Sequence, residues 1–176
     1  MKPRHLRFEH GLTVLELIII LTAIAIVILI SVPGSSMLMG KYNMGKATGD
    51  LMESLQTARY EAMRRHSIVR VCPSSNGRFC RRDGDWSQGW LIFSDGNGDG
   101  AVQDIELLDA YTAPPKTILI VPEGAVQNMA SFDVSGLADD PDGQGGVYHL
   151  CDLGGKTSSR LVNINSDGWI EMIPGE

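Results

Sequence analysis

The chain has 176 residues, of which 43% are hydrophobic and 20% charged, and its formal net charge is −6. This length suits one domain with an appendage and excludes a second full core, since typical domains run to roughly 100–150 residues. The acidic balance opposes a general role in nucleic-acid binding, because phosphates require a basic surface.

An apolar segment lies near the N-terminus, at residues 12–32, and Glu16 is its only ionisable residue. As a helix this segment would extend about 31 Å, the thickness of the hydrocarbon core of a bilayer. The sequence therefore predicts a transmembrane helix at residues 12–32. Lys2, Arg4 and Arg7 precede it, which favours a cytoplasmic N-terminus and an exported remainder.

A removable secretory signal peptide is the alternative interpretation of this apolar segment. The residues that follow it, SVPGSS, provide small side chains but no A-x-A cleavage pattern. The segment is also longer than a usual signal-peptide core.

A charged side chain at bilayer depth costs about 2.5–3.5 kcal/mol and is usually functional, so we expect Glu16 to have a partner.

An amphipathic helix is predicted to continue after the apolar segment. Its apolar face is marked by residues at i, i+4, i+7 and i+11, namely Leu51, Leu55, Ala58 and Ala62. We expect the N-terminal helix to occupy residues 12–66 and to end near His66. Pro33 predicts a bend or an interruption within it, and the glycines that follow predict a pliable middle section.

Short β-prone segments separated by Gly, Asp, Asn and Pro make up residues 67–176. They read SIVRVC, GWLIFSD, ELLDAYT, TILIV, ASFDVS, GVYHLCD, RLVNINS and GWIEMI. Strands of this length and spacing predict antiparallel sheets, with the amphipathic helix packed against them. The predicted fold class is therefore α+β, with a β-rich exported domain.

Three cysteines, Cys72, Cys80 and Cys151, are available for a disulfide in an oxidising compartment. A bond between Cys72 and Cys80 would close a short loop and add about 2–3 kcal/mol of stability. We favour this pairing, although the sequence also allows Cys151 to take either partner.

The segment DGNGDGAVQDIE fits the calcium-loop pattern D-x-[DN]-x-[DN]-G-x5-E. The matching residues are Asp95, Asn97, Asp99, Gly100 and Glu106. Alternating oxygen ligands, a glycine at the turn and a late carboxylate suit a calcium ion, although the helices that frame an EF-hand are missing. The alternative is that Asp, Asn and Gly are simply the preferred turn residues.

The remaining candidate residues favour structure over catalysis. Trp86 and Trp90 are expected in the core of the small domain. The four histidines offer no metal-ligand spacing, and the sequence has no nucleophile motif, phosphate-binding loop or paired-acid constellation. No enzymatic activity and no required cofactor are expected, with calcium as the one candidate ion.

Gly11, followed by Leu-Thr-Val-Leu-Glu and an apolar run, resembles the signal of type IV prepilins and type II secretion pseudopilins. The resemblance implies a leader at residues 1–11, cleavage between Gly11 and Leu12 by a prepilin peptidase, and N-methylation of Leu12. It also implies that Glu16 pairs with the N-terminal amine of a neighbouring subunit during assembly. Leu12 stands where major pilins usually carry Phe, which indicates a minor component.

Motifs beyond the signal resemble the GspH/FimT (FimU-like) branch of pseudopilins and minor pilins. They are an ARxEA helix end at residues 58–62, a Cys-Pro-Ser segment at 72–74 and a Trp-x-x-Gly-Trp strand at 86–90. The last shared feature is an aspartate-rich loop that follows this strand. Together with the signal, the resemblance covers nearly the whole chain and implies a pilin-like fold.

The resemblance implies a minor pilin that helps to initiate or cap a type IV pilus, or a GspH-type pseudopilin of type II secretion. The Cys-Pro-Ser and Trp-x-x-Gly-Trp features favour the pilus. Expected partners are minor and major pilins, the prepilin peptidase, an inner-membrane assembly platform and membrane lipid. The expected localisation is the bacterial inner membrane, single-pass with a periplasmic domain, and then the pilus or pseudopilus.

A DNA receptor for natural transformation is the third possibility, because some relatives in this branch bind DNA through a Gly-Arg-x-Arg motif. At the matching place this chain reads Gly168-Trp169-Ile170-Glu171, without either arginine. Loss of the leader, with three cations and one anion, would also change the net charge from −6 to −8. Arginines do gather locally, at positions 64, 65, 70, 78, 81 and 82, where we expect solvation or pairing with acids of neighbouring subunits. Nucleic acid is therefore not an expected partner.

Overall fold

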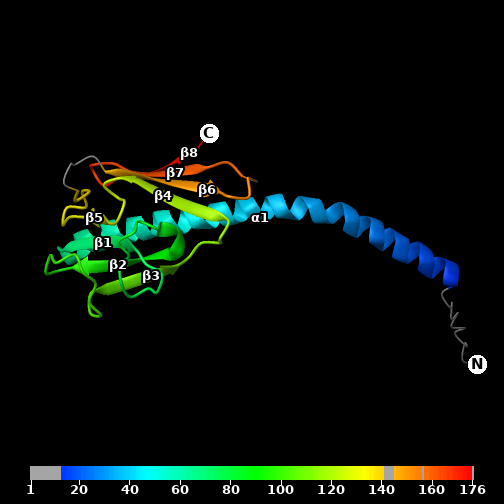
Figure 1. Ribbon diagram of the computed structural model, residues 1–176, viewed down its shortest axis with the longest axis horizontal. Helices are drawn as coiled ribbons and strands as arrows, with labels where there is room; N and C mark the ends of the chain where they lie inside the picture. Colours follow the sequence, from blue (N-terminus) through cyan, green and yellow to red (C-terminus); the bar gives the residue numbers. More distant parts are fainter. Residues whose placement is uncertain (1–12, 141–144, 156, 176) are drawn as a thin grey trace, which may run out of the picture. The chain divides into compact units, whose positions relative to one another are not determined.

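The computed structural model describes residues 13–140, 145–155 and 157–175, except for the side chains of residues 29–36. The chain divides into two compact units, Met1–Leu38 and Met39–Glu176. One helix, α1 (Val14–Arg65), passes from the first unit into the second. The strands all belong to the second unit, where the latter part of α1 runs alongside them (Figure 1).

The second unit contains two antiparallel four-stranded sheets. Their orders are β3-β2-β1-β5 and β4-β6-β7-β8. The strands and the short 3-10 turn are β1 (Ile68–Pro73), η1 (Trp86–Gln88), β2 (Gly89–Asp95), β3 (Leu107–Thr112), β4 (Ile118–Gly124), β5 (Ala130–Phe132), β6 (Gly146–Asp152), β7 (Arg160–Ile164) and β8 (Ile170–Pro174). Each strand lies within one of the predicted β-prone segments or overlaps it, and the predicted α+β fold class is confirmed.

The C-terminal half of α1 packs one apolar face into the core. Its fully buried apolar side chains are Met44, Ala47, Leu51, Leu55, Ala58 and Ala62, which include the four predicted from spacing. The helix ends at Arg65, followed by His66 with a left-handed φ of 51°, a conformation that commonly terminates helices. α1 continues through Pro33, so the interruption predicted there from the sequence is wrong.

Both sheets share the core that α1 enters. The first sheet contributes Val71, Ile92 and Phe132, and the second contributes Leu150 and Val162 among other buried residues. A smaller core covers the opposite face of the first sheet and contains Cys72, Leu91 and Phe93. Strand β2 is therefore buried on both faces, which explains its apolar run at residues 90–93.

Arg59 joins α1 to two distant turns. Its Nε donates to the carbonyl of Gly136 at 2.9 Å, and its Nη2 donates to the carbonyl of Asp167 at 3.3 Å. Gly168 has a φ of 73°, and a Cβ there would lie 2.0 Å from the Gly136 oxygen. A glycine is thus required where these two turns approach each other.

No helix within the part of the chain that the structure describes is sufficiently long and apolar to span a membrane. The span predicted at residues 12–32 includes residue 12 and the side chains of residues 29–32, which lie outside the described residues.

Replacement of Leu55 tests the shared core. Leu55→Ala should lower the free energy of unfolding by about 2–5 kcal/mol, because removal of a large side chain leaves a cavity in a packed core. Gln56→Ala, at an exposed position on the same helix, should change it by less than about 0.5 kcal/mol. Denaturant unfolding followed by tryptophan fluorescence measures both values. Equal losses in the two variants would contradict the assigned helix face.

Candidate functional site

The first turn of α1 carries the carboxylate that the sequence singled out. Glu16 is exposed, and its backbone N–H donates to Thr13 Oγ1 at 3.2 Å. Thr13 therefore caps the helix, and the Thr-x-x-Glu spacing matches a capping box. Sequence reasoning missed this role, although the spacing was a usable signal. Gly11 and Leu12 lie outside the described residues, so their processing stays a prediction.

Apolar side chains surround the first turns of α1 on every side. Those that are large and exposed are Val14, Leu15, Leu17, Ile18, Ile19, Ile20, Leu21, Ile24, Ile26, Val27 and Ile28. Five consecutive members, residues 17–21, cover the full circumference of a helix. A helix that is apolar all round is normally buried, so this segment requires an apolar environment.

A disulfide joins Cys72 in β1 to Cys80, with 5.5 Å between the Cα atoms, which confirms the favoured pairing. Cys151 in β6 is a free, half-buried thiol. The bond closes a loop that is also held by a hydrogen bond from the Arg81 N–H to the Pro73 carbonyl at 2.7 Å. Cys72 and Cys80 both belong to the smaller core, so the disulfide secures the outer face of the first sheet.

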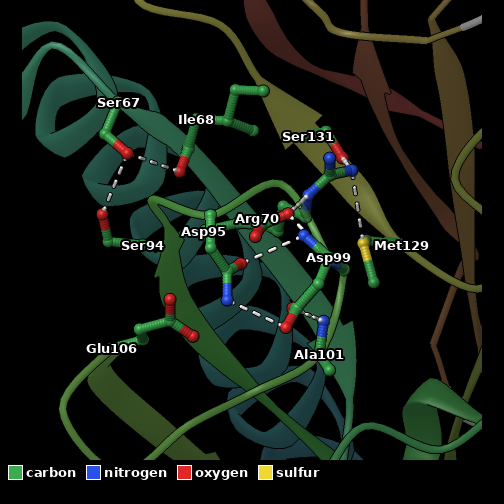
Figure 2. A network of polar contacts seen from close by, with 12 residues as sticks. Ser67, Ile68, Arg70, Ser94, Asp95, Asp99, Ala101, Glu106, Met129 and Ser131 are labelled. Carbon is green, nitrogen blue, oxygen red and sulfur yellow. Dashed lines mark hydrogen bonds and ion pairs between the residues drawn. The ribbon is translucent and has the colours of Figure 1, made fainter.

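The acidic loop, residues 95–106, joins β2 to β3. Asp95 ends β2 with a fully buried side chain. Its Oδ2 accepts hydrogen bonds from Arg70 Nε at 2.6 Å and from the Gly100 N–H at 3.1 Å (Figure 2). Its Oδ1 is buried and has no hydrogen-bond partner. One oxygen of this carboxylate is therefore fixed while the other is left unsatisfied.

The other predicted loop residues are linked to one another by hydrogen bonds. Asp99 Oδ2 accepts from Asn97 Nδ2 at 2.9 Å and from Gln103 Nε2 at 3.2 Å. The Gln103 N–H donates to Glu106 Oε2 at 3.3 Å. The Ala101 N–H donates to Asp99 Oδ1 at 2.8 Å and holds the pKa of Asp99 below its ordinary value. The loop thus gathers Asn97, Asp99 and Glu106 around Gln103, a residue that the sequence analysis did not single out.

In the regions that the structure describes, no three Asp, Glu, His or Cys side chains come close enough to hold a metal ion by themselves. Any ion bound by the acidic loop would therefore also need amide or backbone carbonyl oxygens as ligands. Such mixed oxygen sets are typical of calcium sites.

Four arginines of the local basic group pair with acids of their own chain. Arg64 and Arg65 both bind Glu61, at 2.6 and 2.5 Å, and lower its pKa to about 2. Arg70 binds Asp95, and Arg81 binds Asp83. Arg64 and Arg65 are exposed, as expected for solvated residues, but each of the four arginines also binds an acid of its own chain, a partner that the sequence analysis did not consider.

The tryptophans occupy different environments. Trp86 and Trp90 are fully buried, as expected, and Trp86 Nε1 donates to the Gln127 carbonyl at 3.0 Å. Trp169 is 58% exposed and lines a groove of about 270 Å³ together with Tyr60 and Met63 of α1. Buried tryptophans contribute to the core, whereas Trp169 provides an exposed aromatic surface.

The sequence matches the model of the family described as "Type II transport protein GspH" over residues 47–168. This match covers more than half of the chain, so the protein belongs to the GspH family. The family consists of structural pilin and pseudopilin subunits and not of enzymes. A search of curated proteins finds no match.

Solved structures share the fold. The type IV minor pilin FimU of Pseudomonas aeruginosa (strain PAO1) matches with a TM-score of 0.59 at 20% identity, covering 76% of this chain and 90% of that chain. The minor pseudopilin EpsH from the type 2 secretion system of Vibrio cholerae matches with a TM-score of 0.53 at 10% identity, covering 75% and 97%. This chain is therefore similar in fold to subunits of both kinds of filament.

Loss of the disulfide should destabilise the globular unit. Cys80→Ser should lower its free energy of unfolding by about 2–3 kcal/mol, the loop-entropy contribution of a bond that closes a short loop. Dithiothreitol should have the same effect on the wild type and no further effect on this variant. Cys151→Ser is the matched control and should retain full sensitivity to the reductant. A Cys151→Ser variant insensitive to reduction would contradict the Cys72–Cys80 pairing.

Proposed function

We propose that the protein is a minor pilin that helps to initiate or cap a type IV pilus. The observation that carries the proposal is the change of character along α1. Residues 14–28 are apolar on all sides and exposed, whereas the later part of the same helix buries one face within a globular unit. A subunit with these two parts is suited to an apolar environment at one end and to lateral protein contacts at the other.

The proposed pathway begins in the inner membrane. The apolar segment holds the chain there in a single pass, with the N-terminus in the cytoplasm and the globular unit in the periplasm. Prepilin peptidase removes residues 1–11, and Leu12 becomes the methylated N-terminus. An inner-membrane assembly platform then transfers the subunit from lipid to a filament of minor and major pilins.

Glu16 has a proposed role in that transfer. Cleavage after Gly11 would make Glu16 the fifth residue of the mature chain. There its exposed carboxylate would neutralise the N-terminal amine of a neighbouring subunit. A carboxylate in an apolar environment is strongly stabilised by a cationic partner, and removal of one partner from such a pair is costly. The pairing would therefore favour the axial offset between two neighbouring apolar helices that brings Glu16 of one beside the N-terminal amine of the other.

A pseudopilin of type II secretion is the second candidate function. The matched family carries the description of a type II transport protein, and the EpsH structure has a similar fold. Since pili and secretion pseudopili use the same kind of subunit, these observations support either filament. The Cys-Pro-Ser and Trp-x-x-Gly-Trp segments favour the pilus by resemblance.

A DNA-binding role has less support. Ion pairs with Glu61, Asp83 and Asp95 reduce the positive charge that four arginines would offer to phosphates. The exposed ring of Trp169 could stack on a base, but Glu171 lies two residues away where the family motif has arginine.

Deletion of the gene distinguishes a role in the type IV pilus from a role in the type II secretion pseudopilus. Cells without the protein should lose most surface pilin in sheared fractions, and complemented cells should recover it, because an initiating subunit is required before the major pilin polymerises. Normal pilin together with loss of protein secretion would contradict the pilus proposal and support the pseudopilus.

Replacement of Glu16 tests the amine pairing. Glu16→Ala should leave leader cleavage intact and reduce the amount of the protein in sheared filaments at least tenfold, measured by immunoblot. Thr13→Ala is the matched control, because it removes the helix cap but keeps the carboxylate, and it should be incorporated nearly as well as wild type. Normal incorporation of Glu16→Ala would exclude the pairing.

A further inference from the structure

We propose that the acidic loop closes around one calcium ion, which draws the side-chain oxygens of Asp95, Asn97, Asp99 and Glu106 together as ligands, with the Ala101 carbonyl and Gln103 completing the set. These residues occupy loop positions 1, 3, 5, 12, 7 and 9 of the calcium-loop pattern. Gly100 at position 6 has a φ of 67°, the left-handed conformation that the sharp turn of such a loop requires. This inference goes beyond the proposed role in filament assembly.

The two ends of the loop are held together without the helices of an EF-hand. The Ser94 N–H donates to the carbonyl of Glu106 at 2.9 Å, so the pairing of β2 with β3 continues to the mouth of the loop. This places the first ligand position, Asp95, beside the last, Glu106. The β2–β3 pair thus holds the two ends of the loop together, as two helices do in an EF-hand.

The unsatisfied oxygen of Asp95 is an independent indication of a ligand. Its partner oxygen accepts from the Gly100 N–H, which places the carboxylate across the inside of the loop. Figure 2 shows Asp95, Asp99 and Glu106 in this loop, with contacts drawn to Asp99 and the Glu106 carboxylate standing apart from them. A buried carboxylate oxygen without any hydrogen bond is unusual, and a bound cation would satisfy it.

Arg70 sets the expected strength of binding. Its guanidinium contacts Asp95 Oδ2 at 2.6 Å and Ser131 Oγ at 2.9 Å, so one of the three carboxylates is already partly neutralised. Fewer effective negative charges lower the affinity of an oxygen-ligand site. We expect a dissociation constant on the order of 10⁻⁴–10⁻³ M, as in extracellular calcium modules. Magnesium should bind more weakly, since it demands near-ideal octahedral geometry.

The test uses the full-length chain in detergent, titrated with calcium chloride and, separately, magnesium chloride. Calcium at about 10 mM should raise the midpoint of thermal unfolding by roughly 3–10 °C, as expected for a ligand at 10–100 times its dissociation constant. Equilibrium dialysis should find one calcium ion per chain. Equal effects of the two ions, or no calcium retained in dialysis, would overturn the proposal.

Two loop variants locate the site. Glu106→Gln should weaken calcium binding at least tenfold, because it removes the carboxylate that binds through two oxygens. Asp104→Asn is the matched control: it makes the same change of charge at an exposed position of the same loop that supplies no ligand. The Asp104→Asn variant should bind calcium as tightly as the wild type. If Glu106→Gln is unstable, Asp99→Asn provides the same comparison by dialysis. Equal losses in the control and the ligand variants would refute a specific site.

Discussion

The burial of one face of α1 is the constraint on which the rest of the structure depends. Leu51 and Leu55 belong to the same buried cluster as side chains of both sheets. The helix thus serves as the common third element of the globular unit. Because this burial uses only the part of α1 from Met44 onward, residues 14–28 keep their apolar surface for other contacts.

The same constraint explains how the outer side of the domain is organised. With α1 covering the inner face of the first sheet, its other face must be covered by connecting loops. The disulfide loop and the acidic loop perform this task, and the smaller core of Leu91, Phe93 and Cys72 lies beneath them. Side chains on these loops are thus held in place by a packed sheet, even though the loops contain little regular structure. This arrangement gives a small domain two packed surface loops on one side.

Local patterns in the sequence were sufficient for the elements of the fold. The helix face of Ala58 and Ala62 follows from a period of 3.6 residues, and the strands follow from short apolar segments between turn residues. The sheet orders did not follow, because strand pairing depends on segments far apart in the chain. Arg59 is an example: its partners are backbone carbonyls 77 and 108 residues away, which leave no pattern in the sequence.

The candidate site also combines features that local sequence patterns show with contacts that only the folded chain creates. The spacing of Asp95 and Glu106 was visible in the sequence, but the contact between Asp95 and Arg70 joins residues 25 positions apart and required the pairing of β1 with β2. The Cys72–Cys80 pairing, by contrast, was favoured from the short separation of the two residues, and the structure places Cys80 in the loop that follows β1. Ion pairs between neighbouring strands thus appear only once the sheet is assembled.

The position of the Cys72–Cys80 bond connects folding to the cellular compartment. A disulfide persists in an oxidising environment and is reduced in the cytoplasm, so the outer face of the first sheet gains this constraint only in an oxidising compartment. Oxidation there supplies the last part of the stability of the domain. Under the proposed function, the subunit would therefore be easier to unfold before export than after it.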